Sequence, residues 1–411
     1  MNLYLFNDND RASIYGVGTY LKELVKALEN TSISIHIVHL HSVLPAFKIE
    51  KTNQIEHWYI PEVRNENTFS GSVSKVESYF QNVIYLLRIH IKDIKDLVFH
   101  FNFNLCQLLA RELKMAFNCK TVATIHFTKW MLELNGNLSM FQRIKSKPYY
   151  ILNSYEKTLI ETDKYETLLY KEVDHIIVLC QYTRNILQTE YGIEQDKIVV
   201  IPNGMANANL KKNKNTKNAL RRKWHISEDD LLILFVGRLD AVKGLSYLIK
   251  AFNKVFKIVR NCRLMIVGSG DYDYYMKECE NICTHVTWTG LLKKDKLYEL
   301  YSIADLGVMP SFNEQCSYVA IEMMMHSVPL IASTSAGLRE MVEDGVTALL
   351  VSVVEHPEHM EIDTEVLAEK MILLLQDHFK RKQIGRNGRK RYEQLYTSDT
   401  LRNNMLKCYF S

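Results

Sequence analysis

The sequence predicts two α/β domains, each a doubly wound, mostly parallel sheet with helices on both faces. The 411 residues exceed the roughly 250–300 that one hydrophobic core serves. Short apolar runs rich in β-branched residues alternate with longer stretches of helical period, as in parallel sheets buried on both faces. The alternation stops once, in the polar residues 207–218, and resumes at residue 231. We therefore expect a first domain at 1–205, a second at 206–390, and a helical tail at 391–411 as the candidate for a crossing back to the first.

Eleven apolar runs are the predicted strands, and amphipathic stretches such as YLKELVKALEN and GLSYLIKAFNKVF are the predicted helices between them. The runs lie at residues 3–6, 33–40, 97–101, 121–127, 175–180, 198–202, 231–237, 263–268, 286–290, 306–310 and 328–333. Residues 207–218 carry no apolar period and are interpreted as a linker or surface loop. Residues 137–172, rich in Tyr and Lys, are interpreted as a helical insertion, either a plain packing pair or a surface that faces a membrane or an acceptor.

Composition narrows the class of protein. A hydrophobic fraction of 47% and a charged fraction of 24% are typical of an ordered globular chain. The net charge of +4 is too small for nucleic acid to be the main partner. Cys279 and Cys283 stand one helical turn apart without further ligands at zinc spacing, so the scattered cysteines indicate free thiols in a reducing compartment. The opening MNLYLFNDND is no signal peptide, so we expect a cytoplasmic protein, with peripheral contact at the inner membrane face left open.

The strongest motif runs from residue 310 to residue 345. Glu314 lies in the loop after a predicted strand, and Glu322 follows eight positions later, in a helix that begins near Ser317. The N–H groups and dipole at such a helix start bind a diphosphate well. Two carboxylates repel a diphosphate but accept hydrogen bonds from hydroxyls beside it, which favours Glu314 for a hexose and Glu322 for a ribose. The alternative is a pair of solvated acids.

A second loop, FVGRLDAVKG, opens with Gly237 and carries Arg238 and Lys243 at the end of another predicted strand. Two cations there can neutralise a diphosphate leaving group, although they can equally be surface charges. A third loop, VGSGDY, offers Gly268 for close backbone approach, or is a plain turn. No Asp-x-Asp stands at a strand end, apart from Asp271-Tyr-Asp273 after the glycine turn, so we expect neither a metal nor any other cofactor.

The first half offers weaker candidates. Gly16 and Gly18 precede a predicted helix and allow a phosphate to approach, but the spacing is not that of a dinucleotide-binding fingerprint, which disfavours a dehydrogenase. His126 ends the run TVATIHF, where its imidazole can bond a sugar hydroxyl or a reacting oxygen, or can be a satisfied core histidine. His100 in LVFHFN is a similar, weaker candidate.

These segments, in this order, resemble the retaining glycosyltransferases of family 4, which have the GT-B fold. The resemblance covers most of the chain and is clearest from residue 198 to residue 351. It rests on IPNGM (201–205), FVGRLDAVKG (235–244), VGSGD (267–271), TWTGLLKKDKLYELYSIADLGVMPS (287–311), NEQCSYVAIEMMMHSVPLIASTSAGLREMVEDGVTALLV (313–351) and the opening YGVGTYLKELVKAL (15–28). The segment through HWYIP (57–61) is also similar to a subset associated with bacterial peptide-modification clusters.

The resemblance implies two Rossmann-like domains facing a central cleft and metal-independent transfer of a hexosyl-type sugar from UDP- or GDP-sugar to a glycan, lipid-linked or peptide acceptor. It implies that Arg238 and Lys243 bind the diphosphate, that Glu314 orients the sugar and that Glu322 binds the ribose. The remaining implied positions are Ser317, Tyr318 and Val319 at the phosphates, Leu292 near the base, His126 at the reacting centre, and Gly16 and Gly18 facing the phosphates.

This chain departs from the family pattern at four positions, one of which is Ala336, where the family has the first of two paired glycines before Gly337. Gln315 stands where the family usually has Pro, Ser317 where it has Gly, and Phe127 where it often has Asp. The charged residues Arg238, Lys243, Glu314 and Glu322 are all retained, so we expect activity, with the donor preference open. Two other readings stay open: a nucleotide-sugar 2-epimerase on the same fold, and a non-catalytic module that binds sugar nucleotides.

Overall fold

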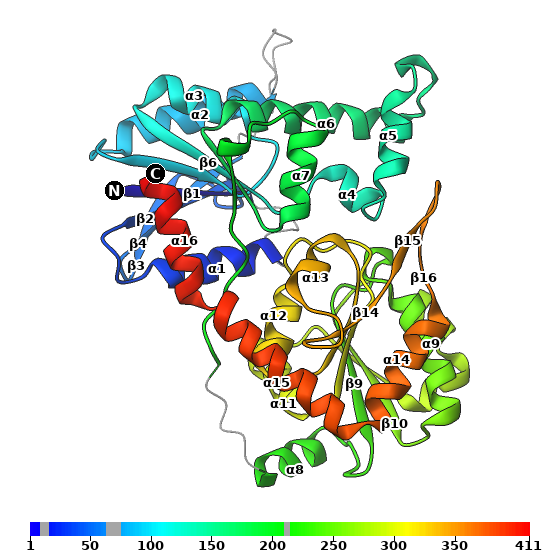
Figure 1. Cartoon of the computed structure of the whole chain (residues 1–411). Helices are drawn as coiled ribbons and strands as arrows, with labels where there is room; N and C mark the ends of the chain where they lie inside the picture. Colours follow the sequence, from blue (N-terminus) through cyan, green and yellow to red (C-terminus); the bar gives the residue numbers. More distant parts are fainter. Residues whose placement is uncertain (9–15, 63–74, 209–213) are drawn as a thin grey trace. The chain divides into compact units, whose positions relative to one another are not determined.

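The computed structural model divides the chain into two compact units (Figure 1). Unit 1 consists of Met1–Lys129, Lys147–Pro202 and Leu401–Ser411, and unit 2 consists of Trp130–Ser146 and Asn203–Thr400. The structure describes residues 1–8, 16–62, 75–208 and 214–411. Each unit is an α/β fold around a doubly wound sheet, so the predicted fold class is confirmed.

The sheet of unit 1 has the strand order β3-β4-β2-β1-β5-β6-β7-β8. Its strands are β1 (Asn2–Asp8), β2 (Ser34–Ser42), β3 (Lys48–Thr52), β4 (Ile55–Pro61), β5 (Leu97–Phe101), β6 (Cys119–Ile125), β7 (His175–Val178) and β8 (Ile198–Val200). All neighbours are parallel except β3 and β4, which form an antiparallel hairpin at the edge. The central strand β1 is buried at five consecutive positions, Asn2 to Phe6, because helices cover both of its faces.

Helices lie on both sides of this sheet, with α1 and α16 on one side and α2 and α3 on the other (Figure 1). The helices of unit 1 are α1 (Gly16–Leu28), α2 (Lys75–His90), α3 (Gln107–Ala116), α6 (Ser154–Glu172), α7 (Gln181–Thr189) and most of α16 (Ser398–Phe410). The α6 helix begins with a capping box, in which Asn153 and Glu156 satisfy each other's backbone N–H groups. From α16, the Tyr409 hydroxyl hydrogen-bonds His100 Nδ1 in β5 at 2.7 Å.

The sheet of unit 2 is entirely parallel, in the order β11-β10-β9-β12-β13-β14. Its strands are β9 (Leu231–Val236), β10 (Cys262–Val267), β11 (Val286–Gly290), β12 (Leu306–Met309), β13 (Leu330–Ser333) and β14 (Leu349–Val351), and a separate hairpin is formed by β15 (Val353–Glu355) and β16 (Met360–Ile362). Counted from β9, this is the order 3-2-1-4-5-6 of dinucleotide-binding folds, and it reverses between β9 and β12.

The helices associated with unit 2 are α4 (Lys129–Glu133), α5 (Leu138–Ser146), α8 (Lys214–Lys223), α9 (Leu245–Ile258), α10 (Tyr272–Glu278), α11 (Lys294–Ile303), α12 (Tyr318–Met325), α13 (Ala336–Met341), α14 (Thr364–Gln376) and α15 (His378–Leu395). Many of them follow a strand directly, which is the alternation expected of a doubly wound sheet. Within the described residues, none of the helices combines the length and the apolar character that a bilayer span requires.

All eleven predicted runs form strands, but the sequence did not reveal the β3–β4 hairpin or strands β14 to β16. The hairpin lies at the sheet edge, where polar and apolar residues mix and no continuous apolar run develops. Residues 209–213 of the expected linker lie outside the described residues, whereas α8 already begins at Lys214, so the end of that segment is helical. The sequence showed no apolar period over α8, and the buried residue in its last turn, Arg221, is charged.

The segment Trp130–Ser146 belongs to unit 2, although it lies in the first half of the sequence. Trp130 and Phe141 are fully buried, with their rings stacked 4.7 Å apart. The Asn137 amide donates to the backbone oxygen of His356 at 2.7 Å, and the Asn313 amide donates to that of Met131 at 2.8 Å. The aromatic pair thus packs within the segment, and the two side-chain to backbone hydrogen bonds tie the segment to the rest of unit 2.

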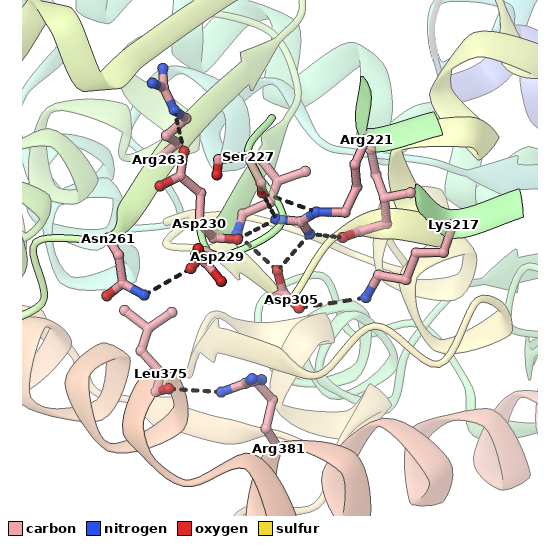
Figure 2. Close-up of polar contacts among 12 residues, drawn as sticks. Lys217, Arg221, Ser227, Asp229, Asp230, Asn261, Arg263, Asp305, Leu375 and Arg381 are labelled. Atoms are coloured by element: carbon pink, nitrogen blue, oxygen red, sulfur yellow. Dashed lines mark hydrogen bonds and ion pairs between the residues drawn. The ribbon is translucent and has the colours of Figure 1, made fainter. Parts of the chain in front are cut away.

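A buried arginine, Arg221, lies at the edge of the unit 2 sheet where strands β9 and β12 begin (Figure 2). The Arg221 guanidinium donates to the carbonyl oxygens of Ser227 and Asp230 and to the Asp305 carboxylate, 3.3 Å away. Asp305, just before β12, also accepts from the backbone N–H of Leu232 in β9 at 2.9 Å. The cluster thus joins α8 to the starts of the two central strands.

We predict that Arg221→Met lowers the free energy of unfolding by about 3–5 kcal/mol, because it removes the buried donor of several carbonyl groups and leaves the partly buried Asp305 carboxylate with the more exposed Lys217, 3.7 Å away, as its cation. Urea unfolding followed by circular dichroism measures the change. The matched control is Arg222→Met, since Arg222 is the next residue of the same helix and is exposed. Equal stability of the two variants would contradict the role given to Arg221.

Candidate functional site

Two loops of unit 2 meet where the strand order of its sheet reverses. One follows β9 and the other follows β12, so both leave the carboxyl-terminal edge of the sheet. The backbone N–H of Phe312 donates to the carbonyl of Val242 at 2.8 Å. Gly244, with φ of 66°, lies so close that a Cβ there would stand 2.0 Å from the carbonyl oxygen of Pro310. Crevices at this position are where open α/β sheets bind their ligands.

A cation from the loop after β9 and a carboxylate from the loop after β12 form an ion pair. Lys243 Nζ donates to Glu314 Oε1 at 2.5 Å, and both side chains are mostly buried. Arg238 Nε donates to Asp240 Oδ2 at 2.7 Å, which uses one of the five N–H donors of its guanidinium. The structure therefore brings three predicted residues, Arg238, Lys243 and Glu314, to one edge of one sheet.

Glycines let the neighbouring loops close on one another at the same edge. The N–H of Gly237 donates to Val267, and that of Gly268 donates to Gly290, each at 3.0 Å. Gly268 has φ of 150°, and a Cβ on it would stand 1.7 Å from the carbonyl oxygen of Gly237. A side chain at Gly268 would therefore displace the loop that holds Arg238.

The third predicted element is the start of α12. Ser317 is its N-cap, and Tyr318 and Val319 form its first turn, where helix geometry points the backbone N–H groups out of the amino-terminal end. The N–H of Ser317 donates to the sulfur of Met341, 3.2 Å away, which is a weak acceptor. The carbonyl of Glu314 accepts from the N–H of Gly337 at 2.8 Å, which fixes the loop before the helix.

Glu322 lies deeper than a solvated acid would. It is 5% exposed, its Oε2 accepts from the Tyr301 hydroxyl at 3.0 Å, and Lys294 Nζ lies 3.6 Å from its Oε1. Lys294 begins α11, two residues after the partly exposed Leu292. The contact thus connects Glu322 with the turn that carries Leu292.

In unit 1, the predicted residues belong to two other strand ends. Gly16 and Gly18 begin α1, with Gly16 exposed and Gly18 buried, whereas Tyr15 of the same motif lies outside the described residues. His126 follows β6 directly, and its ring packs against that of Tyr20 in α1, with centroids 4.7 Å apart. The α1 helix and the loop after β6 are therefore in contact at His126.

Both histidine candidates are neutral groups. Burial lowers the pKa of His126 to about 3, although part of its surface stays exposed, and its Nε2 lies 3.4 Å from Asn102 Oδ1. Burial also lowers the pKa of His100 to about 3, and its two ring nitrogens bond Tyr409 and Thr124 at 2.7 Å. His100 is thus a satisfied core histidine, and His126 is a neutral imidazole that can donate or accept one hydrogen bond.

Sequence reasoning missed the groups that hold the loop of His126. The Asn104 amide donates to the carbonyl of Phe127 at 2.6 Å and to Glu166 Oε1 at 2.9 Å. Glu166, 2% exposed, also accepts from the N–H of Lys129 at 3.1 Å. A polar residue just beyond the strand LVFHF was a usable signal for Asn104, but Glu166 looks like any charged residue of an amphipathic helix.

Comparison with known proteins covers both units. Residues 14–206 match the family described as Glycosyltransferase Family 4, and residues 216–391 match the family described as Glycosyl transferases group 1. The Anabaena protein HepE, solved in complex with UDP and glucose, superimposes with a TM-score of 0.73 over 100% of both chains at 15% sequence identity. At that identity the likeness concerns the fold.

Two curated relatives are each 30% identical to the chain over 53% of its length. One is an uncharacterized glycosyltransferase of Methanocaldococcus jannaschii, and the other is a lipopolysaccharide 1,2-N-acetylglucosaminetransferase of Salmonella typhimurium. The matched part spans 55% and 58% of these relatives, so just over half of each is compared.

We predict that Glu166 makes stability depend on pH. Burial raises the pKa of Glu166 from 4.5 to about 7, outweighing the donors Asn104 and Lys129, while the nearby Asp163 raises it further. The folded protein then binds more protons than the unfolded chain between pH 4.5 and 7, so this stabilising contribution is complete below pH 4.5 and lost as pH rises through 7. Relative to Glu166→Gln, the wild type should lose roughly 3 kcal/mol across this window.

Urea unfolding of both proteins at several pH values between 4.5 and 8 tests this. Glu161→Gln, an exposed change on the same helix, is the control and should follow the wild type. Parallel curves for the wild type and Glu166→Gln would show that Glu166 titrates normally.

Proposed function

Because this chain is a glycosyltransferase of the GT-B, family 4 type, we propose that it transfers a hexosyl-type sugar from a UDP- or GDP-sugar with retention of anomeric configuration. The acceptor in this proposal is a glycan, lipid-linked or peptide hydroxyl, and no metal takes part. The observation that carries it is the contact of Lys243 with Glu314 at the reversal point of the unit 2 sheet.

This contact brings together the two kinds of group that a nucleotide-sugar needs. Lys243 has three N–H donors, so it can keep Glu314 and still donate to a phosphate oxygen. Glu314 has a second carboxylate oxygen, Oε2, which can accept from sugar hydroxyls. A donor whose diphosphate lies at Lys243 would thus have its sugar beside Glu314, as the proposed roles require.

Charge that develops on the leaving diphosphate has three stabilising groups in this proposal. Arg238 and Lys243 supply positive charge, and the first turn of α12 supplies N–H donors and the positive end of its dipole. The weak sulfur contact of Ser317 is readily exchanged for a phosphate oxygen. Hydrogen bonds to Asp240 and Glu314 already hold Arg238 and Lys243, so little reorganisation of these two groups is needed in the transition state.

The neutral state of His126 limits its proposed role. With a pKa of about 3, the imidazole is neutral at neutral pH, so it keeps one N–H for a hydrogen bond but does not serve as a general acid. We propose that it bonds a hydroxyl at the reacting centre and that Asn104 and Glu166 position its loop. Attack of the acceptor oxygen is then assisted by the leaving phosphate on the same face of the sugar, which accounts for retention.

The donor base and the acceptor remain parts of the proposal. UDP is the first base to test, since the HepE structure contains UDP and glucose. A lipid-linked glycan is the first acceptor to test, since one relative is named for lipopolysaccharide. On unit 1, Lys157 and Lys164 of α6 lie over the exposed ring of Tyr149, and Tyr150, Ile151, Tyr165 and Leu168 are exposed as well, a combination typical of surfaces at a membrane interface.

We predict that the purified protein slowly releases nucleoside diphosphate from one donor of a UDP- and GDP-sugar panel without acceptor. Lys243→Ala and Glu314→Gln should each lower kcat/KM for this release about 10²- to 10³-fold, the usual cost of removing a group that stabilises transition-state charge or position. Lys250→Ala, an exposed lysine of α9, is the matched control and should change nothing.

The same reactions separate the competing functions. Sugar epimerised at C2 without acceptor would indicate a 2-epimerase, and donor binding without any turnover would indicate a binding module. The donor selected from the panel is then incubated with candidate acceptors, either free in solution or on vesicles of anionic phospholipid. The acceptor that yields product identifies the acceptor class.

We also predict that 5–10 mM EDTA, roughly a hundredfold excess over trace metal, leaves the rate of transfer unchanged, because Arg238 and Lys243 do the electrostatic work that a divalent ion does elsewhere. Turnover measured before and after chelation, and again with added Mg²⁺, checks this. A strong fall that Mg²⁺ or Mn²⁺ restores would show that a metal takes part.

A further inference from the structure

Two histidines and a glutamate gather on one face of the β15–β16 hairpin. The N–H of His356 donates to the carbonyl of His359 at 2.9 Å, so these residues form the pair next to Glu355 and Met360 in the ladder. Alternation along the strands places this pair on the same face as Glu361, which is paired with Val354. That face points to solvent, since Val354 is 45% exposed, while Ile362 on the other face is buried.

The side-chain geometry is that of a set of metal ligands. The imidazoles of His356 and His359 stack with centroids 4.6 Å apart, and His356 Nε2 lies 3.1 Å from Glu361 Oε2. One ligand atom from each of the three residues lies within 4.8 Å of the others. Bonds of about 2.0–2.2 Å to a tetrahedral zinc ion place ligand atoms roughly 3.3 Å apart, which small side-chain rotations reach from here.

The main chain of the same loop is already fixed from behind. The fully buried Asn137 donates through Nδ2 to the carbonyl oxygens of His356, at 2.7 Å, and His359, at 3.4 Å. Glu355 accepts from the N–H of Ser139 at 2.7 Å. The two histidines therefore stand on the loop that holds the segment Trp130–Ser146 in unit 2.

We propose that His356, His359 and Glu361 bind Zn²⁺ or a similar transition-metal dication, with water completing its coordination, and that the ion fastens Trp130–Ser146 to unit 2. Imidazole and carboxylate ligands favour such ions over Mg²⁺ and Ca²⁺, which prefer oxygen ligands alone. The ion would cross-link the turn to β16 and so stabilise the carbonyl positions that Asn137 bonds. This inference is independent of the proposed transfer reaction, because it uses none of the donor-binding residues.

The test is calorimetric titration of untagged, chelator-treated protein with ZnCl₂. We expect one ion per chain, and at least about tenfold weaker binding in His359→Ala and in Glu361→Gln, since even loss of an outer partner of a ligand costs that much. His90→Ala, an exposed histidine of unit 1, should bind as the wild type does. No saturable binding, or unchanged binding in His359→Ala, would overturn the site. MgCl₂ should give no binding, and equal affinity for Mg²⁺ would also overturn it.

Hydrogen–deuterium exchange tests the fastening role. Zn²⁺ should slow amide exchange in residues 130–146 of the wild type but not of His359→Ala. Asn137→Ala should still bind Zn²⁺ and lose this protection, because the link between the loop and the segment is cut. Zn²⁺ bound to the wild type without any added protection would overturn the fastening role.

Discussion

In a parallel sheet every strand ends at the same edge, and the candidate site of unit 2 depends on this constraint. The order of strands reverses between β9 and β12, which are neighbours in the sheet. The loops that follow these two strands are therefore far apart in the sequence but adjacent in space. Lys243 and Glu314 are 71 positions apart, yet their side chains touch. The backbone bond between Phe312 and Val242 and the close approach at Gly244 hold the loops in this arrangement. The topology of the sheet thus determines which loops form the site, and the side chains on those loops determine its chemistry.

The two units place different electrostatics at their strand ends. In unit 2 the groups are ionic, and Lys243 and Glu314 largely offset the cost of each other's burial. In unit 1 the groups around His126 are neutral, since Tyr20, Thr124 and His100 form a buried polar network without net charge. An ionic site suits a substrate with a charged diphosphate, and a neutral one suits hydroxyls. This contrast supports the proposal that unit 2 binds the diphosphate of the donor and that His126 of unit 1 bonds a hydroxyl.

The sequence predicts the strands, the fold class and the position of the unit 2 loops well because each depends on local apolar pattern. It does not predict Glu166 or Arg221, which are charged residues whose burial depends on partners distant in sequence. It also does not predict that Trp130–Ser146 joins unit 2, since nothing local in that segment says which core receives Trp130 and Phe141. The roles of Arg238, Lys243, Glu314 and Glu322 remain predictions, although the structure brings three of them to one edge.

The division of the chain has a consequence for how such proteins can be recombined. The polypeptide passes from one unit to the other at residues 129–130, 146–147, 202–203 and 400–401. A chimera joined only at residue 202 would import a foreign partner for the unit 2 surface under Asn137, and would leave Tyr409 facing a foreign strand in place of His100. Exchange of donor-binding halves between relatives therefore requires the short segment and the terminal helix to travel with the units they pack on, so the structural modules of this chain are not the contiguous stretches that a gene fragment would encode.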